Sequence, residues 1–218
     1  MSDSPVGSHS LRVLLGGTFN PVHYGHLSVA SQMAWQLNAP VHLVLSARPP
    51  HRSETVVSAE QRWEMLKLAV RGHDQLIADR RELDRDGPSF MVDTLEGFHS
   101  EYPGGSVALA LGSDAAAQLD TWHRADSLAQ WCHLVLIQRP GVRSQVSEKM
   151  LESLGFLVTE KRRDLSNSQA GLCFKMSSVA LEISATAVRQ MIASGGPIRY
   201  MTPPAVVDYV SAAGLYGR

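Results

Sequence analysis

Residues 11–37, LRVLLGGTFNPVHYGHLSVASQMAWQL, contain the pattern that decides the fold. A short apolar run over residues 11–15 stops at Gly16 and Gly17, which is typical of a buried strand in a parallel sheet. Apolar residues then recur at helical spacing over residues 27–37, so a helix is expected to pack one face against that sheet. The stretch therefore predicts a strand, a glycine turn, a loop and a helix.

Two histidines stand at the start of the predicted helix. His26 lies in its first turn, and His23 comes three residues earlier. Backbone N–H groups at a helix start are unpaired and carry partial positive charge, so they favour anions. Two imidazoles beside such a terminus predict a phosphate site. A His-x-x-His metal pair is the alternative, although the sequence offers no obvious third ligand nearby.

The composition is that of a globular α/β protein. The chain has 218 residues, 44% of them hydrophobic and 19% charged, which is enough for one domain with a real core. We expect residues 1–10 to form a disordered extension and residues 11–218 to form a single domain. A formal net charge of −1 provides no basic field for nucleic acid. No apolar run approaches the ~20 residues needed to span a membrane. Neither nucleic acid nor a membrane is therefore expected as a partner.

Cysteine usage and the start of the chain bear on the compartment. Cys132 and Cys173 form no close pair, which favours a reducing environment. The first ten residues, MSDSPVGSHS, lack the basic and apolar regions of a signal peptide. A cytoplasmic enzyme is therefore expected.

Predicted strands alternate with predicted helices along the whole chain. Further strands are expected at residues 41–45, 76–78, 107–111 and 133–137, and helices at 58–69, 93–98, 145–154, 184–192 and 204–210. Residues 161–171 are polar and poorly patterned, and residues 174–183 are expected to be extended. This alternation predicts a Rossmann-like, doubly wound parallel sheet in three α/β/α layers with right-handed crossovers.

The glycine turn and the histidines together resemble a known signature. GGTFNPVHYGH, residues 16–26, resembles G-G-[ST]-F-[DN]-P-x-H-x-G-H of the nucleotidyltransferase superfamily related to class I aminoacyl-tRNA synthetases. Asn20 stands where Asp is commoner. The resemblance implies that His23 and His26 are catalytic and bind the phosphates of ATP. It also implies ATP contacts at Gly16, Gly17, Thr18 and Phe19.

A second segment resembles another motif of the same superfamily. ISATAVR, residues 183–189, resembles I-S-[ST]-T-x-[IV]-R, with Ala185 in place of the commoner Ser. A serine can cap the following helix, and an arginine donates in a planar fork to phosphate oxygens. By itself the segment also fits an ordinary serine-capped helix with a surface arginine. The resemblance implies ATP contacts at Ile183, Ser184, Thr186 and Arg189, with Arg189 also catalytic.

Residues 175–178, KMSS, resemble the lysine motif of class I synthetases. That motif would indicate a tRNA-charging enzyme. The chain is too short to add an anticodon-binding domain and has no basic excess, so we interpret this likeness as a coincidence.

Over residues 11–216 the chain resembles the bacterial nicotinate-nucleotide adenylyltransferases. The segments that carry this likeness are residues 49–52 (PPHR), 58–69 (SAEQRWEMLKLA), 89–95 (SFMVDTL), 112–114 with 122–124 (GSD and WHR), and 201–216. The resemblance implies transfer of the adenylyl group of ATP to nicotinate mononucleotide, giving deamido-NAD and pyrophosphate. It further implies Mg²⁺ bound through the ATP phosphates, with few or no protein ligands.

The acceptor site is implied by the same resemblance. Trp122 would stack on the pyridinium ring, for which an indole face is physically suited. Backbone groups at Met91 and His123 would hold the nicotinate carboxylate, although Met91 replaces the usual Thr. By itself Trp122 also fits a partly buried loop aromatic. Gly112 and Asp114 are assigned to ATP, and Thr94, His51 and Arg139 to the acceptor.

Three other functions remain open at this point. Adenylyl transfer to nicotinamide mononucleotide or to phosphopantetheine would use the same ATP motifs. A non-catalytic nucleotide-binding protein is the alternative from a different class. The oligomeric state cannot be read from the sequence.

Overall fold

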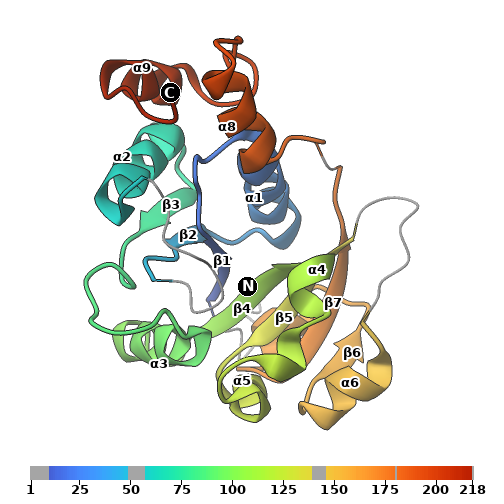
Figure 1. Ribbon diagram of the computed structural model, residues 1–218. Helices are drawn as coiled ribbons and strands as arrows, with labels where there is room; N and C mark the ends of the chain where they lie inside the picture. Colours follow the sequence, from blue (N-terminus) through green and yellow to red (C-terminus); the bar gives the residue numbers. More distant parts are fainter. Residues whose placement is uncertain (1–9, 49–56, 139–145, 180, 218) are drawn as a thin grey trace, which may run out of the picture. The chain divides into compact units, whose positions relative to one another are not determined.

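Seven strands form one parallel sheet in a computed structural model of the chain (Figure 1). Their order is β3-β2-β1-β4-β5-β7-β6, and the strand pairs described with a register are parallel. With its flanking helices this order confirms the predicted doubly wound α/β fold. The structure describes residues 10–48, 57–138, 146–179 and 181–217.

The chain is divided into two compact units. The first unit comprises residues up to 15 together with residues 37–40 and 90–178, and the second comprises residues 16–36, 41–89 and 179 to the end. The expectation of a single domain over residues 11–218 stays a prediction. Apart from Ser10, the predicted extension over residues 1–10 lies outside the described residues.

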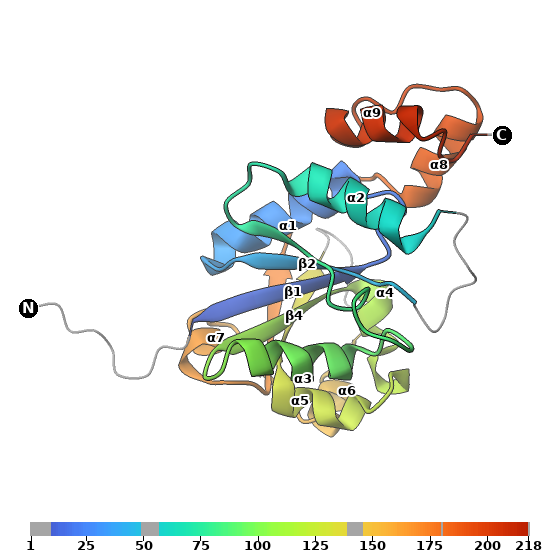
Figure 2. The same ribbon diagram turned by 90° about the vertical axis from the view of Figure 1, so that its left-hand side faces the viewer.

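The first unit contains most of the strands. Its elements are β1 (Leu11–Gly17, through Leu15), α3 (Met91–Glu101), β4 (Ser106–Gly112), α4 (Ser113–Ala116), η1 (Leu119–Thr121), η2 (Ala125–Ser127), α5 (Leu128–Trp131), β5 (His133–Gln138), α6 (Glu148–Ser153), β6 (Leu157–Thr159), α7 (Asp164–Asn167) and β7 (Leu172–Ser177). Six of the seven residues of β4 are buried, as expected for a central parallel strand. Helix α3 packs on α5 (Figure 2).

Three sequence predictions in this unit need correction. Strand β6 and helix α7 occupy a region for which no elements were predicted. Strand β6 pairs only with β7, and its Leu157 is 65% exposed, so it has no apolar alternation to reveal it. The extended segment expected at residues 174–183 is a strand only through Ser177. Helix α6 begins after its cap at Ser147, later than predicted.

The second unit carries the opening stretch and the C-terminal helices. Its elements are the end of β1, α1 (Tyr24–Leu37), β2 (Val41–Leu45), α2 (Ala59–Val70), β3 (Leu76–Asp79), α8 (Ala185–Ala193) and α9 (Pro204–Ala212). The predicted capping box is present, because the Ser58 hydroxyl accepts from the backbone N–H of Gln61 and the Gln61 side chain accepts from Ser58. Helix α9 packs on α2 (Figure 2).

None of the described helices is both long enough and apolar enough to cross a lipid bilayer.

Candidate active site

The loop after β1 folds back on itself at Phe19. This residue has a positive φ of 45°, and its ring is 1% exposed. A Cβ on Gly17 would lie 2.8 Å from the Phe19 ring, so only glycine leaves room for it. The ring also meets His26 edge to face, with centroids 5.0 Å apart. The Phe19 side chain therefore packs within the loop over residues 18–24, called the histidine loop from here on, and its predicted contact with ATP stays a prediction.

His23 and His26, which the sequence placed beside the start of the predicted helix, form a stacked pair. Their ring centroids lie 3.7 Å apart with 26° between the planes. The backbone N–H of His23 donates to Nδ1 of His26 at 3.3 Å. Because Nδ1 accepts this bond, the proton of a neutral His26 is on Nε2. That N–H is a donor available to a ligand.

The environment of the pair favours uncharged imidazoles. Burial lowers the pKa of His23 from its ordinary value of 6.5 to about 4. Burial, together with the neighbouring His23, lowers the pKa of His26 to about 3. Both rings are therefore neutral at pH 7 without a bound anion. The sequence had left this protonation state undetermined.

Gly25 allows two chain segments to approach each other closely. A Cβ at this position would lie 2.9 Å from the His23 ring and 3.1 Å from the carbonyl oxygen of Ile183. Ile183 opens the second predicted motif, 158 residues further along the chain (183 − 25). The two motifs therefore lie side by side within the second unit, which would allow both to contact the phosphates of one ATP molecule.

Helix α8 begins as predicted from the second motif. The Ser184 hydroxyl caps it by accepting from the backbone N–H of Ala187 at 3.1 Å. Arg189 reaches back from this helix, and its Nη1 donates to the carbonyl of Asn20 at 2.7 Å. Its Nη2 lies 3.2 Å from the Thr186 hydroxyl. Arg189 thus joins the second motif directly to the histidine loop.

Side chains bind alternate carbonyls of the histidine loop. The carbonyl of Thr18 accepts from Arg62 at 2.8 Å, and the carbonyl of Val22 accepts from the Thr202 hydroxyl at 2.8 Å. With the Arg189 bond to Asn20, every second carbonyl from residue 18 to residue 22 has a side-chain donor. The loop backbone is therefore fixed by three different parts of the second unit.

The C-terminal segment adds two more bonds to this loop. The backbone N–H of Tyr24 donates to the carbonyl of Met201 at 2.9 Å. The Tyr216 hydroxyl donates to the side-chain oxygen of Asn20 at 2.6 Å. Sequence reasoning assigned no role to Tyr216 or Thr202. The only signal was their place in the family-like segment over residues 201–216.

Three of the predicted acceptor residues, Met91, Trp122 and His123, lie in the first unit at or beside the start of α3. His123 is exposed and stacks on Phe90, with ring centroids 4.2 Å apart. Arg124, in a left-handed conformation with φ 53°, forms an ion pair with Glu96 at 2.8 Å. These contacts bring the segment over residues 122–124 beside the start of α3, where Met91 is the first residue.

Other predicted residues of the first unit have separate surroundings. Trp122 is half-buried, while Gly112 and Asp114 are exposed at the end of β4 and the start of α4. Thr94 is fully buried, and its hydroxyl donates to the carbonyl of Phe90 at 3.3 Å. That bond supports the start of α3. The predicted ligand contacts of these four residues stay predictions.

Two predicted acceptor residues, His51 and Arg139, lie outside the described residues. Within the described ranges, no group of three or more His, Cys, Asp or Glu side chains is placed to hold a metal ion.

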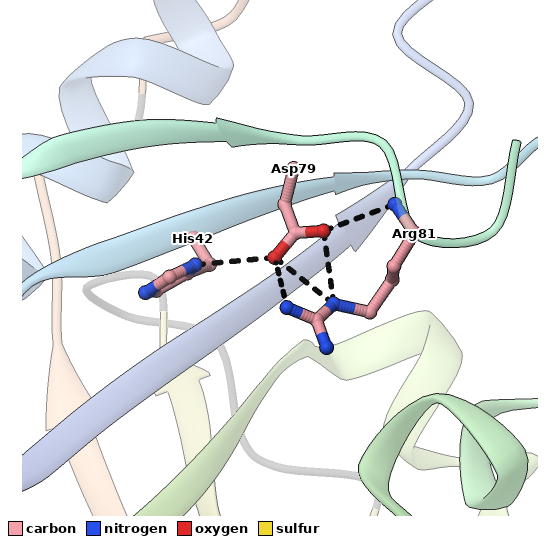
Figure 3. A network of polar contacts seen from close by, with 3 residues as sticks. All are labelled: His42, Asp79 and Arg81. Carbon is pink, nitrogen blue, oxygen red and sulfur yellow. Dashed lines mark hydrogen bonds and ion pairs between the residues drawn. The ribbon is translucent and has the colours of Figure 1, made fainter. Parts of the chain in front are cut away.

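A buried polar network between β2 and β3 was not predicted. Asp79 at the end of β3 contacts Nδ1 of His42 on β2 at 3.1 Å and pairs with Arg81 at 2.8 Å (Figure 3). Burial alone would raise the pKa of Asp79, but hydrogen bonds from His42 and Arg81 lower it to about 2. The network ties β2 to the turn after β3, and a histidine in an apolar strand was its only signal in the sequence.

Comparison with known sequences matches most of the chain to one family. The family described as Cytidylyltransferase-like matches residues 14–191. A probable nicotinate-nucleotide adenylyltransferase of Pseudomonas syringae pv. tomato is 40% identical over 93% of this chain and 92% of its own length. A protein of the same description from Stenotrophomonas maltophilia is 39% identical over 95% of this chain and 97% of its own length.

Comparison with solved structures supports the fold. A Plasmodium falciparum nicotinic acid mononucleotide adenylyltransferase, complexed with NaAD, has a TM-score of 0.71 at 18% identity. The match covers 95% of this chain and 98% of the solved one. At this identity the likeness concerns the fold.

Proposed function

Because the chain belongs to the cytidylyltransferase-like family and to the nicotinate-nucleotide adenylyltransferases, we infer that it transfers the adenylyl group of ATP to nicotinate mononucleotide. The products are deamido-NAD and pyrophosphate. The observation that carries this inference is the 40% identity to such a relative over 93% of the chain. The juxtaposed histidine and arginine motifs of the second unit support it.

The reaction needs alignment and charge stabilisation more than proton transfer. A phosphate oxygen of nicotinate mononucleotide attacks the α-phosphorus of ATP, a new P–O bond forms, and the bond to the bridging oxygen breaks. Pyrophosphate leaves with the electron pair of that bond. The attacking phosphate is already ionised at pH 7, so no general base is required. Catalysis then depends on fixed donors facing the phosphates.

We assign those donors to the two motifs of the second unit. A neutral His26 donates from Nε2 to a phosphate oxygen as negative charge builds, with His23 stacked behind it. The guanidinium of Arg189 carries several N–H donors. Among the described residues, two of them donate hydrogen bonds, to the carbonyl of Asn20 and to the hydroxyl of Thr186. The others are assigned to the β- and γ-phosphates, beside the start of α8 with Ser184 and Thr186.

Gly16, Gly17 and Thr18 are assigned to close backbone approach to the nucleotide. Gly112 and Asp114, exposed in the first unit, are assigned to the rest of ATP.

We assign Mg²⁺ to ATP rather than to a protein cage. The described residues contain no cluster of acidic or histidine ligands for it, and Mg²⁺ sheds its water reluctantly. The phosphate-binding groups of the chain fit an ion that is held by phosphate oxygens and water. When bound there, Mg²⁺ neutralises phosphate charge.

We assign nicotinate mononucleotide to the residues around the start of α3. Trp122 offers an indole face to the pyridinium ring, and backbone groups at Met91 and His123 are assigned to its carboxylate. Thr94, His51 and Arg139 complete the assignment. We place the reaction in the cytoplasm, in keeping with two cysteines that are both free and buried.

A pyrophosphate-release assay tests this function. The full chain is incubated with ATP, Mg²⁺ and one acceptor at a time, and pyrophosphate is measured. We expect the fastest release with nicotinate mononucleotide. Faster release with nicotinamide mononucleotide or phosphopantetheine would reassign the acceptor. Nucleotide binding without release for any acceptor would indicate a non-catalytic binding protein.

A further inference from the structure

Arg62 is a charged residue placed deep inside the second unit. It lies in the first half of α2 and is 1% exposed. Among the described residues no acidic side chain pairs with it, and the bonds that hold it go to backbone carbonyls. Burying a cation among neutral groups is costly, because carbonyl dipoles replace water only in part. A side chain needed only for packing would not require the charge.

The three carbonyls bound by Arg62 come from two separate loops. Its Nη1 donates to Thr18 and to Ser46, both at 2.8 Å, and its Nη2 donates to Ala47 at 3.1 Å. Thr18 follows β1, whereas Ser46 and Ala47 follow β2. These loops leave the carboxyl ends of parallel strands, which is where open α/β sheets bind ligands. One planar guanidinium therefore holds two ligand-side loops at a fixed separation.

Backbone contacts make the same junction rigid. The N–H of Ser46 donates to the carbonyl of Gly17 at 2.8 Å. Gly17 in turn packs on the Phe19 ring, which meets His26 edge to face. A continuous chain of contacts thus runs from Arg62 through Thr18 and Phe19 to the histidine pair. Losing the guanidinium would remove its hydrogen bonds to three carbonyls in buried or part-buried surroundings and free this chain of contacts to move.

We propose that Arg62 is a positioning residue for adenylyl transfer, holding the histidine loop in the geometry that presents His23 and His26 to phosphate. The guanidinium acts through the loop backbone, and it does not itself touch substrate. This inference rests on the proposed catalytic role of the two histidines. Helix α2 thereby has a role in the reaction, although it lies outside the two motifs at residues 16–26 and 183–189.

The test compares Arg62→Met with a control on the same helix. Met65→Ala is the control, because Met65 is fully buried on α2 and forms no bond to the histidine loop. For Arg62→Met we expect kcat per folded molecule to fall about 10–100-fold, the scale for a displacement of about 1 Å at a reacting group. Arg62→Lys keeps the charge but not the fork, and should recover part of this loss. Met65→Ala should lower stability and leave kcat per folded molecule unchanged.

A second readout does not depend on turnover. The imidazole pKa of His26 is measured by NMR without nucleotide. It should be higher in Arg62→Met than the value of about 3 in the unchanged chain, because a displaced loop exposes the ring to water. The same pKa should stay unchanged in Met65→Ala. Wild-type kcat in Arg62→Met, or a lowered kcat with an unchanged pKa of His26, would overturn the proposal.

Failure of the inference and failure of the proposed function give different results. If His26→Ala loses turnover and Arg62→Met does not, the role of Arg62 is wrong and the function stands. If His26→Ala keeps full turnover, the proposed role of the histidines is wrong whatever Arg62→Met does.

Discussion

The histidine loop over residues 18–24 and the segment over residues 122–124, the proposed acceptor segment, are held in opposite ways. In the loop, Phe19 and His23 are almost completely buried, and side chains from α2, α8 and the C-terminal segment bind alternate carbonyls. In the segment, His123 is exposed, and the Arg124–Glu96 ion pair joins side chains that are 45% and 35% exposed. Such surface pairs contribute at most about 1 kcal/mol.

The difference separates two tasks. Stabilising charge on a transferring phosphoryl group requires donors that need no rearrangement at the moment of reaction, so a rigid loop is suited to that task. Recognising a flat ring requires contact area rather than exact donor placement, and stacking tolerates small shifts. We therefore expect substitutions at the loop to affect kcat, and substitutions at the segment to affect KM for the acceptor.

The largest expected effect tests the rigid side of the comparison. His26→Ala should keep the fold and lose about 10²–10³-fold in kcat, the scale for removing one stabilising donor. Steady-state pyrophosphate release measures the loss, and circular dichroism checks the fold. His73→Ala, on an exposed histidine of the same unit, is the control and should retain full activity. Near-normal turnover in His26→Ala would show that His26 is not a donor that stabilises the transferring phosphate.

The buried histidines should also make the protein sensitive to acid. In the folded chain the pKa values of His23 and His26 are about 4 and about 3, below the ordinary value of 6.5. At a pH between the folded and the ordinary pKa, the unfolded chain therefore binds more protons than the folded chain. The free energy of unfolding should therefore fall as pH drops from 6.5 to 4, by up to about 1.4 kcal/mol per pH unit for each histidine. Urea titrations at a series of pH values measure the slope.

A matched variant assigns this slope to the loop. His26→Asn keeps an acceptor for the backbone N–H of His23 but does not titrate, so the slope should become shallower. If His26→Asn had the same slope as the unchanged chain, burial of His26 would not be the cause of the acid sensitivity.

Gly25→Ala tests the close approach of the two motifs. The added methyl group would lie 2.9 Å from the His23 ring and 3.1 Å from the carbonyl of Ile183. Overpacking of this kind costs about 1–3 kcal/mol, and kcat should fall because the histidine ring must shift. Thermal unfolding and turnover are measured together.

Gly97→Ala in α3 is the control for that substitution. Its methyl group would meet no atom within 4 Å, so a gain of about 0.4–1 kcal/mol is expected. Equal effects at the two glycines would contradict the crowding at Gly25.

The smallest expected effect lies on the acceptor side. Trp122→Ala should raise KM for nicotinate mononucleotide by about 2–30-fold, corresponding to about 0.5–2 kcal/mol for a cation over an aromatic face. KM for ATP should not change. Trp35→Ala is the control, since Trp35 is 80% exposed on α1. A rise in KM for ATP alone would reassign Trp122 from acceptor binding to ATP binding.

Local patterns predicted the elements that are buried or capped. The strand ending at Gly16 and Gly17, the Ser58 capping box and the Ser184 cap all follow from signals within a few residues. Strand β6 and helix α7 were missed because they contain only three and four residues, too few to show a periodic pattern, and two of the three residues of β6 are exposed. A strand that gains its bonds from a neighbour only in the folded sheet leaves no such pattern.

The sequence by itself determined the α/β class, the helix start that carries His23 and His26, and the second motif ending at Arg189. These depend on spacing and capping, which act within one turn or one strand. The tertiary structure alone decided the neutral state of the histidine pair and the Nε2 proton of His26. It also revealed Arg62, Thr202 and Tyr216 as the groups that fix the loop. Burial and long-range hydrogen bonds arise from residues far apart in the chain, so no local pattern contains them.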